Sequence, residues 1–194
     1  MAAAAVLAGG ASRRMGRDKA TLAVGGVALA AGVLAAAARV ADPVVLVAPE
    51  GHPARGLGAP VVTDPGEGPL AALAAALAAL EAEHVLVLAA DHPGLVVDLL
   101  AHLAALAPRG EAVACRRGPR LEPLVAVYRR VPALAAARAR LAGPPAGRSP
   151  RGLLADLDTV VVEEPDWRAL DPGGRSFVDL DDPDDLAAWE LGPR

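Results

Sequence analysis

The sequence predicts a three-layer, doubly wound α/β fold with a mostly parallel sheet. Short runs of strand length alternate with longer segments of helical spacing, which is typical of this fold class. The strand-like runs are apolar throughout, as expected of strands that are buried on both faces. The 194 residues suit one domain, 1–194, because neither an internal repeat nor a linker divides the chain.

The predicted elements alternate from the N-terminus onward. Strand-like runs cover 3–8, 44–48, 60–63, 85–90, 112–115, 124–128 and 159–162, and a last strand-like piece covers 177–180. Helical segments cover 27–40, a stretch from Pro69 with leucines at 70, 73, 77 and 80, 95–106, 132–141, a short piece near 153, and 183–189. In such a sheet, ligands bind at the edge where the strands end.

Composition and charge exclude several classes of protein. The net charge of −4 and the pI of about 5.5 argue against nucleic-acid binding. The single cysteine, Cys115, excludes an internal disulfide and a cysteine-based zinc site, and its apolar run predicts a buried thiol. The uncharged run 20–38 is long enough for a membrane span, but it is rich in alanine and interrupted by Gly25-Gly26, so it predicts a turn followed by a helix. No signal-peptide pattern begins the sequence, and we expect a cytoplasmic protein without membrane contact.

The only lysine of the chain is a candidate site residue. Eighteen of the nineteen basic residues are arginines, and Lys19 is the exception. A lysine ammonium is a compact point charge, whereas an arginine presents a planar fork, so a retained lysine indicates a site that the fork does not fit. The alternative is a surface lysine without a role.

Lys19 ends a loop that directly follows the first strand. The loop runs Leu-Ala-Gly-Gly-Ala-Ser-Arg-Arg-Met-Gly-Arg-Asp-Lys over 7–19. Gly9 and Gly10 allow a sharp turn and a close approach to a ligand, and Arg13 and Lys19 supply positive charge for a triphosphate. The loop lacks the Walker and the dinucleotide-binding glycine patterns, and an ordinary exposed, arginine-rich loop is the alternative.

The complete string resembles the signature Leu-Ala-Gly-Gly-x-Ser-x-Arg-Met-Gly-x-Asp-Lys of the molybdenum cofactor guanylyltransferases, the MobA-type proteins. The resemblance continues along the chain through short motifs in the same order: Asp64 with Gly-Pro-Leu-Ala at 68–71, Ala-Asp-His-Pro at 90–93, Glu-Pro-Leu at 122–124 with Tyr128, and Phe-Val-Asp-Leu-Asp-Asp-Pro at 177–183. It implies a Rossmann-like nucleotidyltransferase fold, Mg²⁺ as cofactor, and GTP and molybdopterin as partners. It also implies transient contact with other cofactor-biosynthesis proteins or with molybdoenzymes.

The resemblance assigns roles to individual residues. It implies that Leu7, Ala8 and Gly9, with Gly10 beside them, bind the guanine through the backbone. It also implies that Lys19 holds the phosphates, that Asp64 helps to bind the nucleotide, and that Asp91 holds Mg²⁺. A lone carboxylate at the end of a buried strand independently favours a cation there, and oxygen ligands suit Mg²⁺. The alternatives are a helix N-cap for Asp91 and a loop cap for Asp64.

Several positions depart from the family pattern. Asp179 and Asp181 stand where the family commonly has asparagine, and Asp181 is a candidate second metal ligand. The neighbouring acids at 182, 184 and 185 are instead typical of a helix start. His92 replaces the usual methionine and is interpreted as shaping the loop, and the family's asparagine after the second strand is absent from 48–51. Two arginines, Arg148 and Arg151, are open to either phosphate binding or a surface role.

The resemblance implies that the terminal phosphate of molybdopterin attacks the α-phosphorus of GTP and that pyrophosphate leaves. Asp91 with Mg²⁺ would position the reacting phosphates, while Lys19 and Arg13 would offset charge on the leaving group. Three alternatives stay open. They are a cytidylyltransferase acting on the same pterin, which Gly9-Gly10 disfavours, a non-catalytic cofactor-binding protein of the same fold, and a sugar-1-phosphate nucleotidyltransferase.

Overall fold

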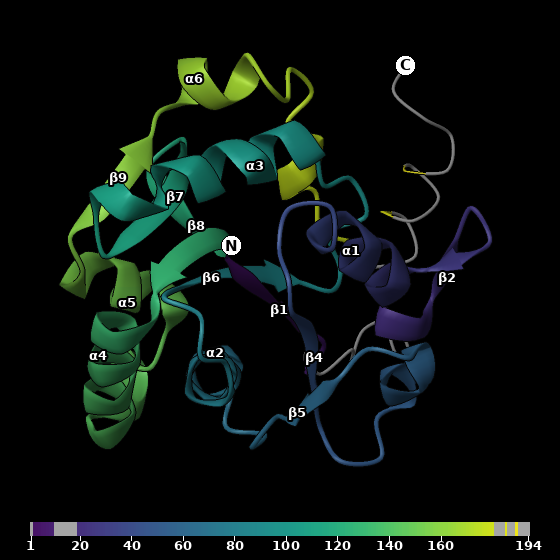
Figure 1. The fold of residues 1–194 in the computed structure, drawn as a ribbon, viewed down its shortest axis with the longest axis horizontal. Coiled ribbons are helices and arrows are strands. Elements are labelled where there is room, and N and C mark those ends of the chain that lie inside the picture. Colours follow the sequence, from purple (N-terminus) through teal and green to yellow (C-terminus); the bar gives the residue numbers. More distant parts are fainter. Residues whose placement is uncertain (1, 10–18, 181–184, 186–188, 190–194) are drawn as a thin grey trace.

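The computed structural model describes residues 2–9, 19–180, 185 and 189. Its central feature is a seven-stranded sheet in the order β5-β4-β1-β6-β8-β7-β9 (Figure 1). The first four of these strands are mutually parallel, β8 runs antiparallel to β6 and β7, and β9 is parallel to β7. The bounds are β1 Ala3–Leu7, β4 Val44–Ala48, β5 Val61–Thr63, β6 His84–Ala89, β7 Ala112–Arg117, β8 Arg120–Arg129 and β9 Thr159–Val162. The predicted mostly parallel sheet is confirmed.

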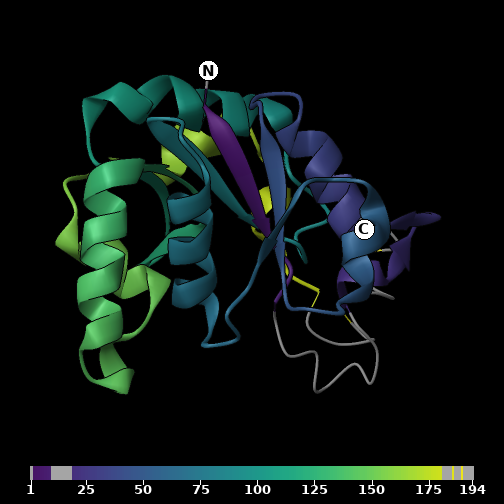
Figure 2. The same ribbon diagram turned by 60° about the horizontal axis from the view of Figure 1, so that its bottom comes forward.

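Helices cover both faces of this sheet. One face carries α1 (Leu29–Ala37), α3 (Val97–Leu106) and α6 (Glu164–Arg168), and the other carries α2 (Pro69–Ala79), α4 (Arg130–Ala142) and α5 (Pro150–Asp156). The turned view shows α2 and α4 side by side, with α3 across the sheet from them (Figure 2). The three-layer arrangement that the sequence predicts is therefore confirmed.

Strand β1 shows why the strand-like runs are apolar throughout. Its side chains alternate between the two faces, so that Ala4 and Val6 pack with α1 and α3, while Ala5 and Leu7 pack with α2. All five β1 residues are buried. Because each face is covered by helices, no position of this strand can carry a polar side chain without burying it.

The segment predicted as a helix over 27–40 is shorter than expected. The helix α1 occupies only Leu29–Ala37, since Val27–Ala28 (β3) pairs with Ala23–Val24 (β2) in a small hairpin. The turn of this hairpin is Gly25-Gly26, and both glycines have positive φ, which other residues rarely adopt. The predicted turn before an alanine-rich helix is confirmed. Within the residues that the structure describes, none of the helices combines the length and the apolar character that a bilayer crossing requires.

The C-terminal part differs most from the prediction. The strand-like piece expected at 177–180 is wrong, because a 3-10 turn occupies Arg175–Phe177 and the following residues pair with no strand. The short helix α6 was not predicted, because five residues are too few to show helical spacing. Most of the helix predicted at 183–189 lies outside the described residues. The two residues of this segment that are described, Asp185 and Trp189, are helical.

Cys115 and Tyr128 lie buried on opposite faces of the sheet. Burial raises the pKa of the Cys115 thiol to about 12, and the nearby carboxylates of Glu122 and Asp171 add to the shift. The thiol is therefore protonated and inert at neutral pH, as its apolar run predicts. Burial likewise raises the pKa of Tyr128, whose hydroxyl donates a 2.8 Å hydrogen bond to the Pro123 carbonyl.

We expect Tyr128→Phe to lower the free energy of unfolding by about 1–2 kcal/mol, because the substitution leaves the Pro123 carbonyl without its donor. Urea unfolding followed by circular dichroism measures the change. The control is Val131→Ala, whose side chain is 66% exposed and whose loss should change the free energy of unfolding by less than about 0.5 kcal/mol. Equal stabilities of the two variants would contradict a structural role for the Tyr128 hydroxyl.

Candidate functional site

The C-terminal end of β1 lies between two neighbouring strands that hold it in place. The Ala8 N–H donates to the Val47 carbonyl of β4 at 2.8 Å, and the Ala90 N–H beyond β6 donates to the Leu7 carbonyl at 3.0 Å. Leu7 and Ala8 are buried, whereas Gly9 is exposed. The backbone thus leaves the sheet at Gly9 in a fixed position and direction.

These hydrogen bonds determine which backbone groups are available to a ligand. The sheet already uses the Ala8 N–H, and Leu7 offers only a second lone pair on its carbonyl oxygen. The next two groups along the chain, the Ala8 carbonyl and the Gly9 N–H, have no hydrogen-bond partner among the described residues. They form an adjacent acceptor and donor at the exposed edge of the sheet.

Asp64 packs against this exit point. It follows β5 directly, its N–H donates to the Ala48 carbonyl at 3.0 Å, and it is only 7% exposed. One carboxylate oxygen accepts the Gly66 N–H at 2.8 Å, so the predicted loop cap exists. The other oxygen lies so close to Gly9 that a Cβ at this position would collide with it. Asp64 therefore caps its own loop and also determines that residue 9 is a glycine.

Asp91 lies on the other side of β1, just beyond the end of β6. Its side chain is 30% exposed, and its carboxylate is 3.9 Å from His92 Nε2, which is too long for a hydrogen bond. The alternative of a helix N-cap is wrong, because Val96 occupies that position of α3. The Asp91 carboxylate accepts no hydrogen bond from the described residues, so its oxygens are free to bind a cation.

The environment of Asp91 fits Mg²⁺, which commonly takes one or two carboxylates together with phosphates and water. Asp179 lies one residue before Leu180, whose N–H donates to the Asp91 carbonyl at 3.3 Å. Among the described residues no group of three or more histidine, cysteine or acidic side chains could hold a metal by itself. A magnesium ion at Asp91 would therefore need ligand phosphates to complete its coordination.

The Asp91 neighbour His92 is 9% exposed. Its Nδ1 atom is buried and makes no hydrogen bond within the described part of the chain. This burial agrees with the interpretation that His92 shapes the loop.

The Gly-Pro-Leu-Ala motif at 68–71 forms the start of α2. Gly68 is the N-cap residue, with φ of +96° and no side-chain cap, and Pro69 begins the helix. Pro69 has no N–H, and the Ala71 N–H donates to the Gly68 carbonyl at 3.0 Å, so the Leu70 N–H and the partial positive charge of the helix are what favour anions such as phosphate. The motif thus adds a neutral, anion-favouring element close to Asp64.

Several predicted site residues lie outside the described part of the chain. These are Gly10, Arg13 and Asp181, and the side chain of Lys19, whose backbone begins a 3-10 turn at Lys19–Thr21. Their roles therefore stay predictions.

Arg148 and Arg151 are both occupied by backbone contacts. The Arg148 guanidinium donates twice to the Gly143 carbonyl, at 3.1 and 3.2 Å, and the Arg151 Nε lies 3.5 Å from the Leu121 carbonyl. These contacts engage both guanidiniums with nearby backbone and so favour the surface role that the sequence left open beside phosphate binding.

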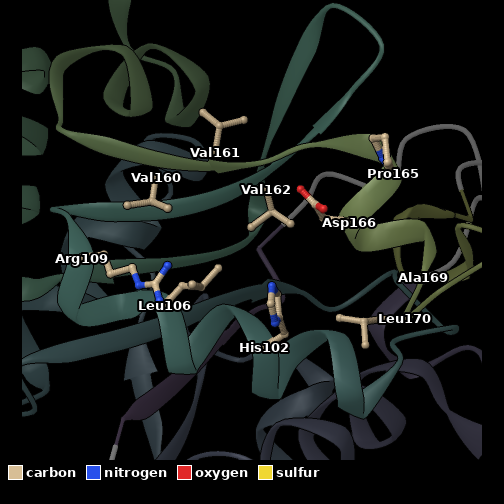
Figure 3. A pocket seen from close by; sticks show the side chains of 10 residues that line it. All are labelled: His102, Leu106, Arg109, Val160, Val161, Val162, Pro165, Asp166, Ala169 and Leu170. Carbon is tan, nitrogen blue, oxygen red and sulfur yellow. The ribbon is translucent and has the colours of Figure 1, made fainter.

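A separate pocket of about 550 Å³ lies between α3, β9 and α6 (Figure 3). Val160 and Val162 project toward α3, and the polar groups at its rim are His102, Arg109 and Asp166. The pocket contains none of the residues predicted for nucleotide or metal binding. It lies at the β9 end of the sheet, away from the end of β1.

Comparison with known proteins identifies the family. The MobA-like NTP transferase domain matches residues 4–165. The chain belongs to this family. A MobA-like relative from Chloroflexus aggregans, named "Probable molybdenum cofactor guanylyltransferase", is 34% identical over 93% of this chain and 89% of its own length. The molybdenum cofactor guanylyltransferase of Rhodobacter capsulatus is 47% identical over 53% of this chain and 57% of its own.

A solved structure agrees with this assignment to the MobA-like family. Molybdopterin-guanine dinucleotide biosynthesis protein A from Archaeoglobus fulgidus superposes with a TM-score of 0.82 at 28% identity, and the match covers 97% of both chains. The fold is therefore that of a MobA-like nucleotidyltransferase.

Some residues of this MobA-like site were not found from the sequence. Ser176 accepts a hydrogen bond from the loop that follows β6, whereas Asp171 and Arg117 bond to the segment that carries Ser176. None of the three belongs to a motif or to a periodic segment. A buried serine and a buried aspartate become visible only when the fold brings distant segments together.

We expect Gly9→Ala to weaken GTP binding by about tenfold or more, because the new methyl group must displace the Asp64 carboxylate or move the backbone beside the base. Calorimetric titration with GTP and Mg²⁺ measures this affinity.

The matched control is Gly32→Ala in α1, where a Cβ meets no atom within 4 Å. This control should bind GTP normally and unfold at a slightly higher temperature, since alanine favours the helix by about 0.5–1 kcal/mol. Unchanged GTP affinity in Gly9→Ala would contradict the expected contact of Leu7–Gly9 with the nucleotide.

Proposed function

We propose that the chain transfers GMP from GTP to the terminal phosphate of molybdopterin loaded with molybdenum, and that it releases pyrophosphate. Its membership of the MobA-like NTP transferase family and its relatives among the molybdenum cofactor guanylyltransferases support this proposal. The structural observation that carries it is the position of Leu7–Gly9, whose backbone is fixed between Asp64 and Asp91 at the ligand-binding edge of the sheet.

Backbone groups at the end of β1 suit a guanine base. Guanine presents neighbouring donors, N1–H and N2–H₂, beside the acceptor O6. The Ala8 carbonyl can accept from the donors while the Gly9 N–H donates to O6, and both groups lack partners among the described residues. The Asp64 carboxylate, buried against Gly9, keeps this pair in position. The predicted contact of Leu7 is then limited to its carbonyl.

The triphosphate would extend from the base toward Asp91 and the start of α2. In our proposal Asp91 would hold Mg²⁺, and Asp181 stays a candidate second ligand. Bound Mg²⁺ would supply neutralisation of the charge on the phosphates. Lys19 and Arg13 would balance the negative charge that grows on the leaving pyrophosphate, as a preorganised positive environment does.

The transfer itself forms one bond and breaks one bond. An oxygen of the molybdopterin phosphate bonds to the α-phosphorus of GTP, and the bond between the α-phosphorus and the bridging oxygen to the β-phosphate breaks. A phosphate nucleophile is already ionised at neutral pH, so no general base is needed. The buried His92 side chain is consistent with this mechanism, because no other role is required of it. Orientation of the two substrates is then the main contribution of the chain.

We also propose that this activity takes place in the cytoplasm. The acceptor is an intermediate of cofactor assembly, so transient contact with the proteins that supply the pterin or receive the product is part of the proposal. The net charge of −4 gives no support to nucleic acid as a partner.

We expect Asp91→Asn and Lys19→Ala each to lower the turnover number about a hundredfold or more, because each removes a charge that acts on the reacting phosphates. Pyrophosphate release with GTP, Mg²⁺ and molybdenum-loaded molybdopterin measures the activity. The control is Asp166→Asn, which removes an exposed carboxylate at the α3–β9 pocket and should leave the turnover unchanged.

Substitution of CTP for GTP in the same assay tests the base. A clear preference for CTP would replace the proposal with a cytidylyltransferase. Absence of pyrophosphate release with either nucleotide, in a folded protein that still binds the pterin, would favour a non-catalytic cofactor-binding protein.

A further inference from the structure

The tail segment (Asp171–Leu180) lies along the Asp91 loop (Asp91–Val96), which connects β6 to α3 (Figure 1). At the α3 end of the loop, the buried Ser176 hydroxyl accepts the Val96 N–H at 2.9 Å. Val96 is the N-cap residue of α3, and its own side chain cannot accept a hydrogen bond. The tail segment therefore supplies an acceptor to a loop that is some eighty residues earlier in the chain.

Two further contacts join the tail segment to the same loop. Gly94 packs so tightly that a Cβ there would lie 2.5 Å from the Arg175 carbonyl oxygen and 2.6 Å from the Trp189 ring. At the β6 end of the loop, the Leu180 N–H donates to the Asp91 carbonyl at 3.3 Å. The tail segment thus contacts the start, the middle and the end of the Asp91 loop.

The first half of the tail segment is a rigid turn. Asp171 is 2% exposed, and its two carboxylate oxygens accept the N–H groups of Arg175 and Ser176 at 2.9 and 2.8 Å. The Phe177 ring packs edge-on against Trp167 at a centroid distance of 4.9 Å. A buried carboxylate that is fully hydrogen-bonded fixes the local backbone strongly.

Arg117 binds the tail segment at the Phe177 carbonyl. It ends β7, and its Nη1 donates to the Phe177 carbonyl at 2.6 Å. Its Nε lies 3.3 Å from a carboxylate oxygen of Glu122, which orients the guanidinium. The Arg117 side chain is 48% exposed, so this contact is not part of the buried core.

We propose that Arg117 is a positioning residue for the metal site, and that it acts by holding the tail segment against the Asp91 loop. Asp179 lies between two anchored residues, Phe177 on the Arg117 guanidinium and Leu180 on the Asp91 carbonyl. These anchors fix the backbone on both sides of Asp179. In this proposal the Asp179 carboxylate then serves the Asp91 metal site directly or through water. This inference rests on the proposed function, since it assigns the support of the same metal site.

Two substitutions test the proposal. Arg117→Ala removes the hydrogen bond to the Phe177 carbonyl, and Gly94→Ala disturbs the packing of the Asp91 loop against Arg175. In both variants, hydrogen exchange of peptides that cover 171–180 should become several-fold faster, because the contacts that protect the segment are lost. The Mg²⁺ concentration for half-maximal turnover should rise about fivefold or more, while KM for GTP at saturating Mg²⁺ stays within about twofold. The double variant should require about as much Mg²⁺ as the more severely affected single variant. The two effects should not multiply, because both substitutions act through one segment.

Matched controls separate this role from general stability. Arg116→Ala removes the neighbouring guanidinium, which pairs with the exposed Glu163 on the surface. The backbone carbonyl of residue 116, which accepts the Trp167 indole N–H, stays intact. This variant and Gly32→Ala should keep the exchange rates and the Mg²⁺ requirement of the unmodified protein. Arg117→Lys should recover part of the effect, since an ammonium can still donate to one carbonyl.

Two results would overturn the inference. One is unchanged exchange of the tail segment in both Arg117→Ala and Gly94→Ala, which would mean that these contacts do not hold it. The other is faster exchange with an unchanged Mg²⁺ requirement, which would mean that the segment does not position the metal site. Mn²⁺ binding in the presence of GTP, followed by electron paramagnetic resonance, gives a readout independent of turnover. If the unmodified protein transfers no nucleotide but the variants bind Mn²⁺ more weakly, the proposed function fails and the inference stands.

Discussion

Two hydrogen bonds hold the end of β1 between β4 and β6, and they determine which backbone groups the proposed nucleotide site can use. They connect the Ala8 N–H to the Val47 carbonyl and the Ala90 N–H to the Leu7 carbonyl. These are the last backbone groups at the end of β1 that pair within the sheet. The first groups left over belong to Ala8 and Gly9, at the point where the chain leaves the buried layer. A polar group there needs a partner from outside the sheet, whether solvent or ligand. The binding edge is therefore a direct result of where the ladder ends.

The two acidic residues at this edge play different parts, although both directly follow a buried strand. Asp64 is engaged with the Gly66 N–H and lies against Gly9, so its charge is already committed to the local backbone. Asp91 has no comparable donor among the described residues, and its side chain is more exposed. The environment thus distinguishes a carboxylate that shapes the nucleotide loop from one that can bind a cation.

Most of the fold could be predicted from the sequence, because strands buried on both faces and helices with one apolar face leave clear patterns. The interior strand Val44–Ala48 and the edge strand Thr159–Val162 were predicted with their observed bounds. Hydrophobic periodicity does not predict elements that are too short to show it or that are held by side-chain contacts. The hairpin across Gly25-Gly26 uses two-residue strands, and the segment after Arg175 is held by side-chain contacts rather than by a ladder.

The candidate site was predictable to the extent that its residues lie next to each other in the sequence or end a strand. Leu7 to Gly9, Asp64 and Asp91 satisfy this condition. Arg117, Asp171 and Ser176 do not, because their partners are distant in the chain and become neighbours only after folding. Long-range polar contacts leave no periodic pattern in the sequence. Sequence reasoning therefore finds the residues expected to face the ligand but misses the residues that hold them in place.

The reversed direction of β8 has a consequence for how such an enzyme can diversify. Because β8 runs antiparallel to β6, the turn between β7 and β8 emerges at the same edge of the sheet as the end of β6. A wholly parallel sheet would place the start of the next strand at the opposite edge. Hairpin turns accept insertions without altering the register of the strands that they join. The β7–β8 turn can therefore change in length during evolution while the end of β1, where we propose that the base binds, keeps its shape.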